Sequence, residues 1–584
     1  MARRSAAEDD RTVMQLALKE ARPAFFLIAI FSFFLNLLYL VSPLYMLQVY
    51  DRVLTSGSRE TLLYLTLIAV AALMVFGALE AVRTSLLARL GRWLHERCSN
   101  EILEASLNVS VKGRSVGAQP LRDFQQVQSF IGGPSLNPFF DAPWVPAFIG
   151  CLWILHPWLG VLGLVSAIVM LAVALVNELV TRKPLKESSS ASVLAFDEAE
   201  RVASQHETVY TLGMFPHLAS RWRSTASAAQ ARSLEASELS GMLTGLSRFL
   251  RMGVQVGVLG VGALLVLMSE LSAGSMIAGS ILLGRALAPI EQSLGAWKAL
   301  VAARVGFERL QALLREAPPG AEPMRLLDPT GQLAAHSVFV KAGQGDQLIL
   351  RNISFKLEPG EAIAVIGPSA SGKSTLCRVI CGLITPIKGS IRLDGAEVGQ
   401  WPRSQFSEAV GYLPQDVQIF PGSVKENIAR MAPDANAQDV IDAAIAADVH
   451  ELILGLPDGY DTKIGRGGHP LSGGQKQRLG LARAVFSKPR LVVLDEPNAN
   501  LDQQGEQALL MTMKRLKASG SGIILVAHRQ AVLEFVDKIL VLKDGTVELF
   551  DTRDAVMEVM RERRRFAARA SSDRKADPAG GTQA

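Results

Sequence analysis

The sequence predicts two folded parts of different class: an N-terminal α-helical domain with six transmembrane helices and a C-terminal α/β P-loop domain. Three observations lead to this expectation. Hydrophobic residues make up 49% of the 584 residues, and the mean hydropathy of +0.24 is high for a soluble protein. The long apolar stretches all lie before about residue 290, and the remainder is typical of a soluble domain. A glycine-rich loop then follows a short strand-like run at 362–366.

The membrane domain is predicted from apolar stretches that are long enough to cross a bilayer, which takes ~20 residues in a helix. Because backbone groups cannot stay unpaired in lipid, these stretches must be helices. The six candidates are 24–49, 61–82, 142–158, 159–180, 250–270 and 275–290. His156-Pro157 marks a tight break between the third and fourth. Arg285 interrupts the sixth, and it could either face protein or a water-filled cavity, or reach the interface by snorkelling.

The distribution of lysine and arginine predicts the orientation of these helices, because such residues favour the cytoplasmic side. The N-terminal segment is basic, and it leads into a long apolar run without a small-residue cleavage site, so we expect a retained anchor. The stretches after the second, fourth and sixth spans are also basic, with Arg83, Arg89, Arg92, Arg97, Arg182, Lys183, Lys186, Lys298, Arg304 and Arg309. Both ends of the chain are therefore expected in the cytoplasm. The polar segments 83–141 and 181–249 are expected to continue as helices beyond the bilayer.

Charge and cysteine content exclude other classes of protein. The net charge of +5 is small for this length and not concentrated, so we expect no nucleic-acid partner. The cysteines Cys98, Cys151, Cys377 and Cys381 form no metal-binding or disulfide framework. We interpret Cys377 and Cys381 as buried small hydrophobic residues.

The chemistry of the second part begins at Gly367-Pro-Ser-Ala-Ser-Gly-Lys-Ser-Thr375, which matches G-x-x-x-x-G-K-S in the strand–loop–helix context that this motif needs. Backbone N–H groups and a helix N-terminus would surround phosphates, Lys373 would neutralise them, and the Ser374 hydroxyl would bind Mg2+. The candidate nucleotide-binding residues of this loop are Gly367, Ser369, Ser371, Gly372, Lys373, Ser374 and Thr375.

A second apolar run, 491–494, ends in Asp495 and Glu496. On its own, an acidic pair after a strand is often a helix cap. Together with the phosphate loop it predicts a nucleotide site, in which Asp495 holds the metal and Glu496 polarises the attacking water.

Between these motifs, Leu471-Ser-Gly-Gly-Gln-Lys-Gln-Arg478 resembles the signature of the ATP-binding cassette (ABC) family. Three further features match that family in order: Gln415 the glutamine loop, Asp502 the acidic loop, and His528 the switch histidine. The resemblance covers nearly the whole chain, six spans followed by a C-terminal cassette.

The resemblance implies ATP and Mg2+ as cofactors. It implies catalytic roles for Glu496 and His528 and a metal held by Ser374, Gln415 and Asp495. The residues it places on ATP outside the phosphate loop are Gln415, Ser472, Gly473, Gly474, Gln475 and Asp502. In this family the phosphate loop of one chain meets the signature of another, so a chain with one cassette is expected to form a homodimer.

We expect five segments: a cytoplasmic N-terminal segment (1–22), a transmembrane domain (23–315), a linker (316–330), a nucleotide-binding domain (331–565) and a polar tail (566–584). Three positions depart from the family pattern. Ala370 stands where relatives often have glycine, which is acceptable if its φ is negative. Arg466 replaces a usual glutamate, and only Phe339 lies near the expected adenine-stacking aromatic.

Within the ABC family the chain is most similar to type I secretion permease/ATPases, which export unfolded proteins with C-terminal signals. The segments that carry this likeness are Ser42-Pro-Leu-Tyr-Met-Leu-Gln-Val-Tyr-Asp-Arg-Val-Leu54, Leu121-Arg-Asp-Phe124, Phe139-Phe-Asp-Ala-Pro-Trp-Val-Pro146, Gly411-Tyr-Leu-Pro-Gln-Asp416 and Glu496-Pro-Asn-Ala-Asn-Leu-Asp502. The likeness implies a place in the bacterial inner membrane, in contact with membrane lipid. It implies a periplasmic membrane-fusion adaptor, an outer-membrane channel protein and a secreted protein substrate as partners.

Two alternatives remain. A lipid or drug exporter would have the same architecture, and a neighbouring adaptor gene would argue against it. A cassette protein that regulates without transporting is disfavoured, because Glu496 and His528 are both present.

Overall fold

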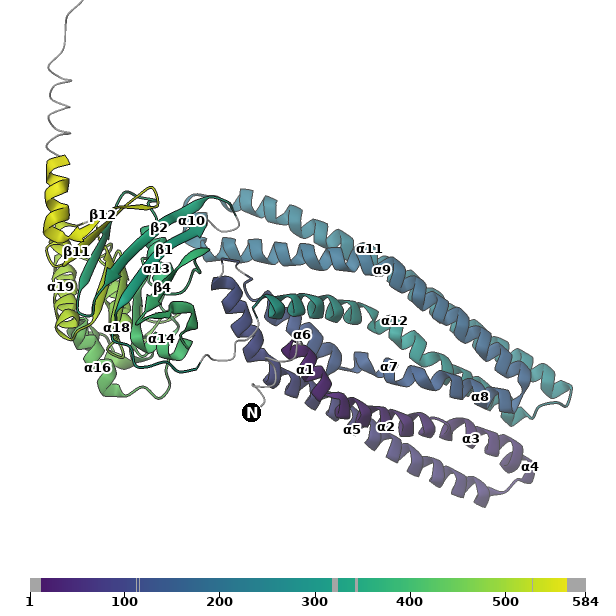
Figure 1. Cartoon of the computed structure of the whole chain (residues 1–584). Helices are drawn as coiled ribbons and strands as arrows, with labels where there is room; N and C mark the ends of the chain where they lie inside the picture. The colour runs from purple at the N-terminus through teal and green to yellow at the C-terminus, as the bar shows by residue number, and fades with distance from the viewer. Residues whose placement is uncertain are drawn as a thin grey trace, which may run out of the picture. The chain divides into compact units, whose positions relative to one another are not determined.

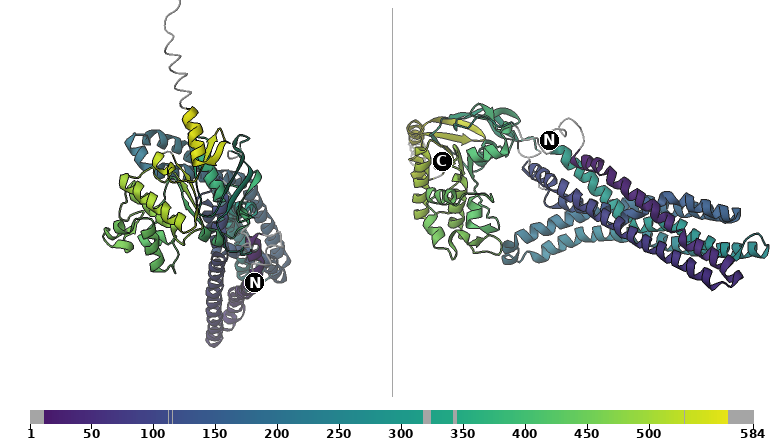
Figure 2. Two further views of the ribbon diagram at one scale, coloured as in Figure 1. Left: turned by 60° about the vertical axis from the view of Figure 1, so that its left-hand side comes forward. Right: turned by 90° about the horizontal axis from the view of Figure 1, so that it is seen from below.

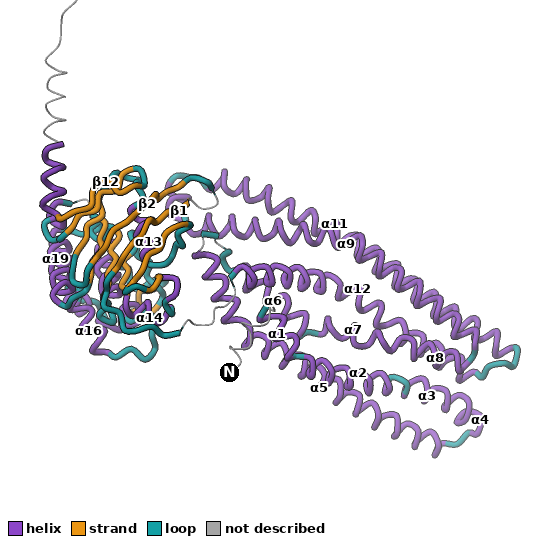
Figure 3. The backbone as a smooth tube through the Cα atoms, viewed as in Figure 1, coloured by secondary structure: helices purple, strands orange, loops and turns teal. Residues whose placement is uncertain are grey.

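The computed structural model describes residues 12–111, 113–114, 116–317, 324–341, 345–527 and 529–563, which belong to two compact units (Figure 1). Within these residues the N-terminal unit contains helices alone, and the strands lie in the C-terminal unit (Figure 3). His528 and the tail expected at 566–584 lie outside the described residues.

The N-terminal unit confirms the prediction of six membrane-crossing helices. The stretches that are long and apolar enough are Arg22–Ser56, Arg59–Val111, Pro134–Leu155, Pro157–Ser204, Phe215–Leu267 and Ala273–Glu316. Its elements are α1 (Val13–Glu20), α2 (Arg22–Leu38), α3 (Val41–Gln48), the π-helix Val49–Val53, α4 (Leu54–Ser56), α5 (Arg59–Val111), α6 (Gln119–Ile131), the 3-10 helix Pro134–Leu136, α7 (Asn137–Asp141), the 3-10 helix Ala142–Trp144, α8 (Val145–Leu155), α9 (Pro157–Ser204), α10 (His206–Thr211), α11 (Phe215–Leu267) and α12 (Ala273–Glu316).

Two breaks interrupt the apolar stretches. The third span ends at Leu155 rather than at the predicted Trp158, because His156 is extended (φ −163°, ψ 138°) and Pro157 starts α9. The first span contains a turn at Tyr39 and Leu40, and it is π-helical near its C-terminal end, at Val49–Val53. The break at His156-Pro157 is the one that the sequence indicated, whereas the turn at Tyr39 lies within an apolar run and was not predicted.

The long polar segments do continue as helices past the predicted spans, as expected. The α5 helix runs to Val111, α9 runs to Ser204 and α11 starts at Phe215. The α9 and α11 helices pack along each other and lie side by side from each direction (Figures 1 and 2). The Arg285 guanidinium of α12 lies 4.1 Å from the centre of the Tyr39 ring. This contact favours the alternative in which Arg285 faces protein.

The C-terminal unit is built on a six-stranded sheet with the order β12-β11-β3-β10-β9-β6 and a four-stranded antiparallel sheet with the order β2-β1-β4-β5. Strands β3 (Ala362–Ile366), β9 (Leu491–Asp495) and β10 (Gly522–Val526) are buried throughout, as continuous apolar runs in a parallel sheet should be. The remaining strands are β1 (Leu333–Lys341), β2 (Leu348–Leu357), β4 (Lys388–Leu393), β5 (Ala396–Glu397), β6 (Val410–Leu413), β7 (Gly422–Ser423), β8 (Lys463–Ile464), β11 (Lys538–Lys543) and β12 (Thr546–Thr552).

Helices cover this sheet, and three of them begin beside the predicted motifs: α13 (Lys373–Ile380), α18 (Gly473–Val485) and α19 (Gln503–Ala518). The others are α14 (Arg403–Ala409), α15 (Val424–Ile428), α16 (Ala437–Ala446), α17 (His450–Leu454) and α20 (Gln530–Leu533). Strands β3 and β9 run parallel in the sheet, so their carboxyl ends meet at one edge. The sequence motifs follow at that edge.

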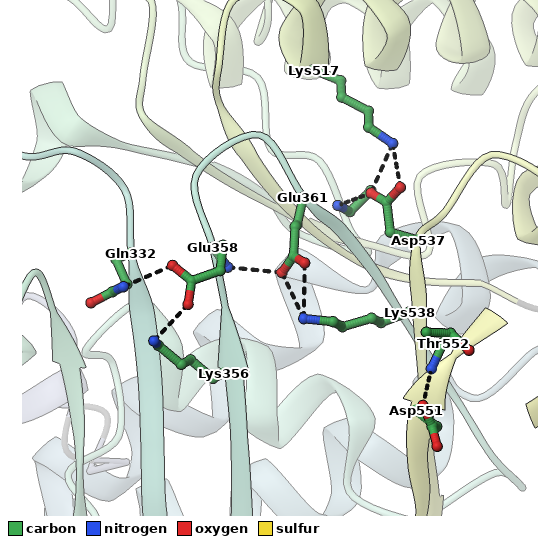
Figure 4. Close-up of polar contacts among 10 residues, drawn as sticks. Gln332, Lys356, Glu358, Glu361, Lys517, Asp537, Lys538, Asp551 and Thr552 are labelled. Carbon is green, nitrogen blue, oxygen red and sulfur yellow. Dashed lines mark hydrogen bonds and ion pairs between the residues drawn. The ribbon is translucent and has the colours of Figure 1, made fainter. Parts of the chain in front are cut away.

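Ion pairs gather at the opposite end of β3 (Figure 4). The Ala362 N–H donates to Asp537 at 2.9 Å, and Lys517 lies 2.6 Å from the same carboxylate. Glu361 pairs with Lys538 at 2.9 Å. These side chains are partly exposed, so each pair stabilises the fold only modestly. They fix the start of β3, whose other end carries the phosphate loop.

Candidate functional site

The phosphate loop joins β3 to α13 and depends on two glycines. Gly367 has φ 155° and Gly372 has φ 99°. A Cβ atom on Gly367 would lie 2.1 Å from the Leu542 carbonyl oxygen, and one on Gly372 would lie 2.6 Å from Leu350 Cδ2. Glycine is therefore required at both ends of the loop by space as well as by backbone conformation.

Ala370, inside the same loop, does not meet the condition under which alanine is readily accepted there, a negative φ. Its φ is 63°, in the left-handed region. This conformation costs an L-residue about 1–2 kcal/mol, so the loop holds local strain. Closure of the loop between its two glycines imposes the strain, and only the folded backbone reveals it.

Lys373 and Ser374 begin α13 and point to different partners. Lys373 is only 7% exposed. Its ammonium group donates to the carbonyl oxygens of Gly367 at 3.0 Å and Pro368 at 2.9 Å. The Ser374 hydroxyl donates to Asp495 Oδ1 at 3.0 Å. Among the side-chain atoms that the structure describes, the buried Ser371 hydroxyl has no hydrogen-bond partner. The loop thus gathers a cation, two hydroxyls and successive backbone N–H groups.

The two predicted carboxylates lie at the end of β9. Asp495 is 2% exposed, and this burial raises the pKa of its carboxyl, while the hydrogen bond from Ser374 opposes the shift. Glu496 follows with φ 49°, and Gln415 Nε2 donates to its Oε2 at 2.9 Å. The structure therefore brings together Lys373, Ser374 and Asp495, with Gln415 and Glu496 adjoining them.

Oxygen donors of this kind suit Mg2+, which proteins usually hold through one or two carboxylates together with substrate phosphates. Ser374 and Asp495 are already within hydrogen-bond distance of each other and fit such a site. Within the described residues, no group of three or more His, Cys, Asp or Glu side chains forms a metal site. Protein ligands alone are thus too few here, and phosphate oxygens would have to complete the coordination.

The signature residues occupy the first turn of α18. Ser472 is its N-cap: its hydroxyl accepts from the Gln475 N–H at 3.2 Å, and the Gln475 side chain accepts from the Ser472 N–H at 2.8 Å. The adjacent Gly474 is held close to a neighbouring segment, because a Cβ there would lie 3.0 Å from the Asn500 carbonyl oxygen. Asp502 caps α19 by accepting from the Gly505 N–H at 2.7 Å. Ser369 lies in the phosphate loop, Thr375 lies in the first turn of α13, and Gly473 is the first residue of α18.

Two residues that the sequence did not single out connect the signature helix to the backbone of Glu496. Gln477, 2% exposed, donates through Nε2 to the Glu496 carbonyl oxygen at 3.4 Å. Asn500 Nδ2 donates to Gln477 Oε1 at 3.3 Å. The polar residues of the segment 496–502 could have drawn attention to this region, although the sequence alone does not show that Asn500 contacts Gln477.

Arg466 and Phe339, two positions that depart from the expected pattern, lie in different surroundings. Arg466 is exposed in a turn between Gly465 (φ 89°) and Gly467 (φ 80°). Phe339 is half-buried, with the Lys388 ammonium 5.7 Å from its ring centre. His528, the predicted switch histidine, lies outside the described residues.

Comparisons with known proteins agree with this geometry. The family model for the ABC transporter matches residues 350–499, and that for the ABC transporter transmembrane region matches residues 25–287. The chain is 40% identical to the type I secretion system ATP-binding protein PrsD of Rhizobium meliloti (strain 1021), over 93% of each chain. It is 28% identical to the cyclolysin secretion/processing ATP-binding protein CyaB of Bordetella pertussis, over 89% of this chain and 74% of that one.

A solved structure of a bacterial Atm1-family ABC exporter with ATP bound has the same fold. The TM-score is 0.79, with 96% of this chain and 99% of the other covered, at 21% identity. At this identity the likeness supports the architecture alone.

Proposed function

Because this chain belongs to the ABC transporter family, we propose that it is the membrane and ATPase subunit of a type I secretion system that exports proteins from the cytoplasm. The observation that carries the proposal is the 40% identity to PrsD over 93% of both chains, since PrsD is named for type I secretion. A match of this extent includes the membrane domain, in which the exported molecule would be recognised. A lipid or drug exporter is the competing candidate.

The residues at the sheet edge support specific roles in ATP hydrolysis. Lys373 would exchange its two loop carbonyls for phosphate oxygens, and the loop N–H groups would hold the remaining phosphate charge. Ser374 and Asp495, with Gln415, would hold Mg2+, which neutralises charge on the phosphates. Glu496 would orient and polarise the attacking water, and His528 would act beside the terminal phosphate.

The chain would act as a homodimer. Its phosphate loop and its signature each occur once, and the contacts of Ser472 and Gln475 stay within the first turn of α18. A second copy would place its signature, Ser472 to Gln475, on the nucleotide held by the first. Binding of two ATP molecules would then favour the closed dimer, and hydrolysis would release it.

The proposed setting is the bacterial inner membrane, with both termini in the cytoplasm. This orientation rests on the basic residues that flank the predicted spans. A periplasmic adaptor and an outer-membrane channel would continue the path outward, and a secreted protein would be the substrate.

The decisive experiment compares the proteins released into the medium by cells that carry this chain and by cells with Glu496→Gln. Removing a positioned catalytic base typically lowers turnover ~100-fold or more, so the variant should bind ATP while release of the exported protein stops. Mass spectrometry of the medium measures this, and a Glu534→Gln variant, altered at a carboxylate outside the site, is the control. An unchanged set of released proteins together with altered lipid or drug content would favour the competing candidate.

A further inference from the structure

The helical unit contains a recess that the ATPase reaction does not use. Helices α6, α9, α11 and α12 line two adjoining cavities of about 290 and 470 Å3. Leu185 and Lys298 border both cavities, so the two lie next to each other, and together they are called the groove below. The larger cavity alone falls within the ~300–1,000 Å3 that is usual for ligand-binding pockets.

The groove is basic and rich in hydroxyl groups. Arg122 lines the smaller cavity and Lys298 lines both, whereas Arg248 of the larger cavity is ion-paired with Glu291 at 3.7 Å. Among the residues described around the two cavities there is no aspartate or glutamate. The hydroxyl groups come from Ser188, Ser189, Ser192, Ser233, Ser237, Ser240, Thr181 and Thr244. Such a lining favours an anionic ligand that also offers hydrogen-bonding groups along its length.

Arg122 belongs to the segment 121–124, one of the sequence features that distinguish this chain, and its neighbour fixes the helix that carries it. Asp123 is buried and accepts from Arg309 of α12 at 2.7 and 2.9 Å. Its helix approaches α12 closely, because a Cβ on Gly306 would lie 3.0 Å from the Asp123 carbonyl oxygen. The Asp123 carboxylate is thus committed to Arg309, and it holds α6 rigidly against α12.

Arg122 itself contacts α9, where its guanidinium lies 4.8 Å from the centre of the Phe196 ring. An aromatic contact orients a guanidinium without neutralising it. The fold therefore presents a positioned positive charge to the groove. Val193, Phe196 and Val301 supply apolar surface beside it.

We propose that this groove binds a carboxylate of an extended peptide segment of the exported protein, with Arg122 and Lys298 as the groups that recognise the charge. The proposal rests on the proposed function and names its substrate-binding site. The hydroxyls would bond the peptide backbone, and the apolar residues would contact its side chains. Val193 and Val301 of the smaller cavity lie beyond the predicted spans 159–180 and 275–290. At ~1.5 Å per helical residue they are about 16–20 Å past the span ends, farther than the ~5–8 Å of a headgroup layer, so a lipid headgroup would not reach this part of the groove.

The test measures peptide binding to the full-length protein in nanodiscs by fluorescence anisotropy. Three dye-labelled decapeptides of serine, valine and leucine serve as probes: one with a free C-terminal carboxylate, one amidated, and one amidated with two internal aspartates. Tight binding of the first alone assigns the site to a chain terminus, and binding of the first and third assigns it to peptide carboxylates in general. Removing one charge-assisted hydrogen bond should weaken peptide binding about tenfold.

Arg122→Ala and Lys298→Ala should therefore each weaken binding of the charged peptides about tenfold, and Arg122→Lys should weaken it less because the charge remains. Arg223→Ala, at an exposed arginine of α11 that does not line the groove, is the matched control. Equal binding of charged and amidated neutral peptides would overturn the proposal. So would displacement of the peptide by short-chain phosphatidylglycerol together with equal affinity in Arg122→Ala. Absence of peptide binding in a protein that still secretes in cells would refute this site and leave the proposed function standing.

Discussion

A buried ion pair between two spans makes the stability of the membrane unit depend on Arg83. This residue of α5 is only 4% exposed, and its guanidinium lies 3.0 Å from Asp141 and 2.8 Å from Glu80. It also donates to the Ser32 hydroxyl at 3.0 Å, while Asn36 donates to Asp141 at 3.0 Å. The network therefore joins α2, α5 and α7 through polar contacts in an apolar surrounding.

Replacing Arg83 alone should lower the free energy of unfolding more than replacing Arg83 and Asp141 together. In Arg83→Met, Asp141 would keep only the Asn36 amide, and an uncompensated buried charge costs about 3–5 kcal/mol. In Asp141→Leu, Arg83 would keep Glu80 at 2.8 Å, so the loss should be smaller. The double variant replaces the pair with apolar side chains and should be more stable than Arg83→Met alone.

Thermal unfolding in detergent, followed by tryptophan fluorescence at one scan rate, measures these differences. With about 2 °C per kcal/mol for a unit of this size, Arg83→Met should lower the Tm by about 6–10 °C. Arg92→Met, at an exposed arginine of the same helix, is the control and should stay close to the wild type. Equal Tm values for Arg83→Met and Arg92→Met, or a double variant whose loss equals the sum of the single losses, would refute the reasoning.

Two further outcomes follow from local geometry. Gly274→Ala should destabilise the protein, because the new Cβ would lie 2.6 Å from the Asp51 carboxylate. That carboxylate also accepts a hydrogen bond from the Gly274 N–H at 2.9 Å. Gly77→Ala is the control and should leave the Tm unchanged, because nothing lies within 4 Å of its Cβ; thermal unfolding distinguishes the two variants. Burial raises the pKa of the Cys377 and Cys381 thiols, so at neutral pH neither should form the thiolate that reacts with maleimide. Mass spectrometry should find both unlabelled in the native protein and labelled after denaturation, and labelling of the native protein would contradict the burial.

The sequence predicted the architecture well where a physical requirement dictates which kinds of residue a segment must contain. Crossing a bilayer demands length and apolarity, and the six spans met that demand. The turn at Tyr39 and the π-helix Val49–Val53 were not predictable, because they change backbone hydrogen bonding without changing hydropathy. The third span ends at Leu155 instead of Trp158, at the His156-Pro157 break that the sequence indicated, because the backbone of His156 is extended.

The sequence predicted those parts of the candidate site in which the functional residues are close together along the chain. Lys373 and Ser374 follow the loop whose phosphate they would hold, and Asp495 ends a strand parallel to β3. Gln477 and Asn500 were missed because their connection to Glu496 exists only through tertiary packing. In the same way, the sequence shows which residues are charged but not which residues they form ion pairs with.

Arg83 shows where that limit matters for function. Counting basic residues places Arg83 on the cytoplasmic flank of the second span, yet the structure pairs it with Asp141, which belongs to the distinctive segment 139–146. Asp123, of the distinctive segment 121–124, is likewise bound to an arginine of another helix. Each of these aspartates thus fixes its own helix to a different neighbour: α7 to α5 through Asp141, and α6 to α12 through Asp123. Sequence features that distinguish this chain from other exporters would then act first on how the helices of the membrane unit are held, and through them on which groups, Arg122 among them, face the exported molecule.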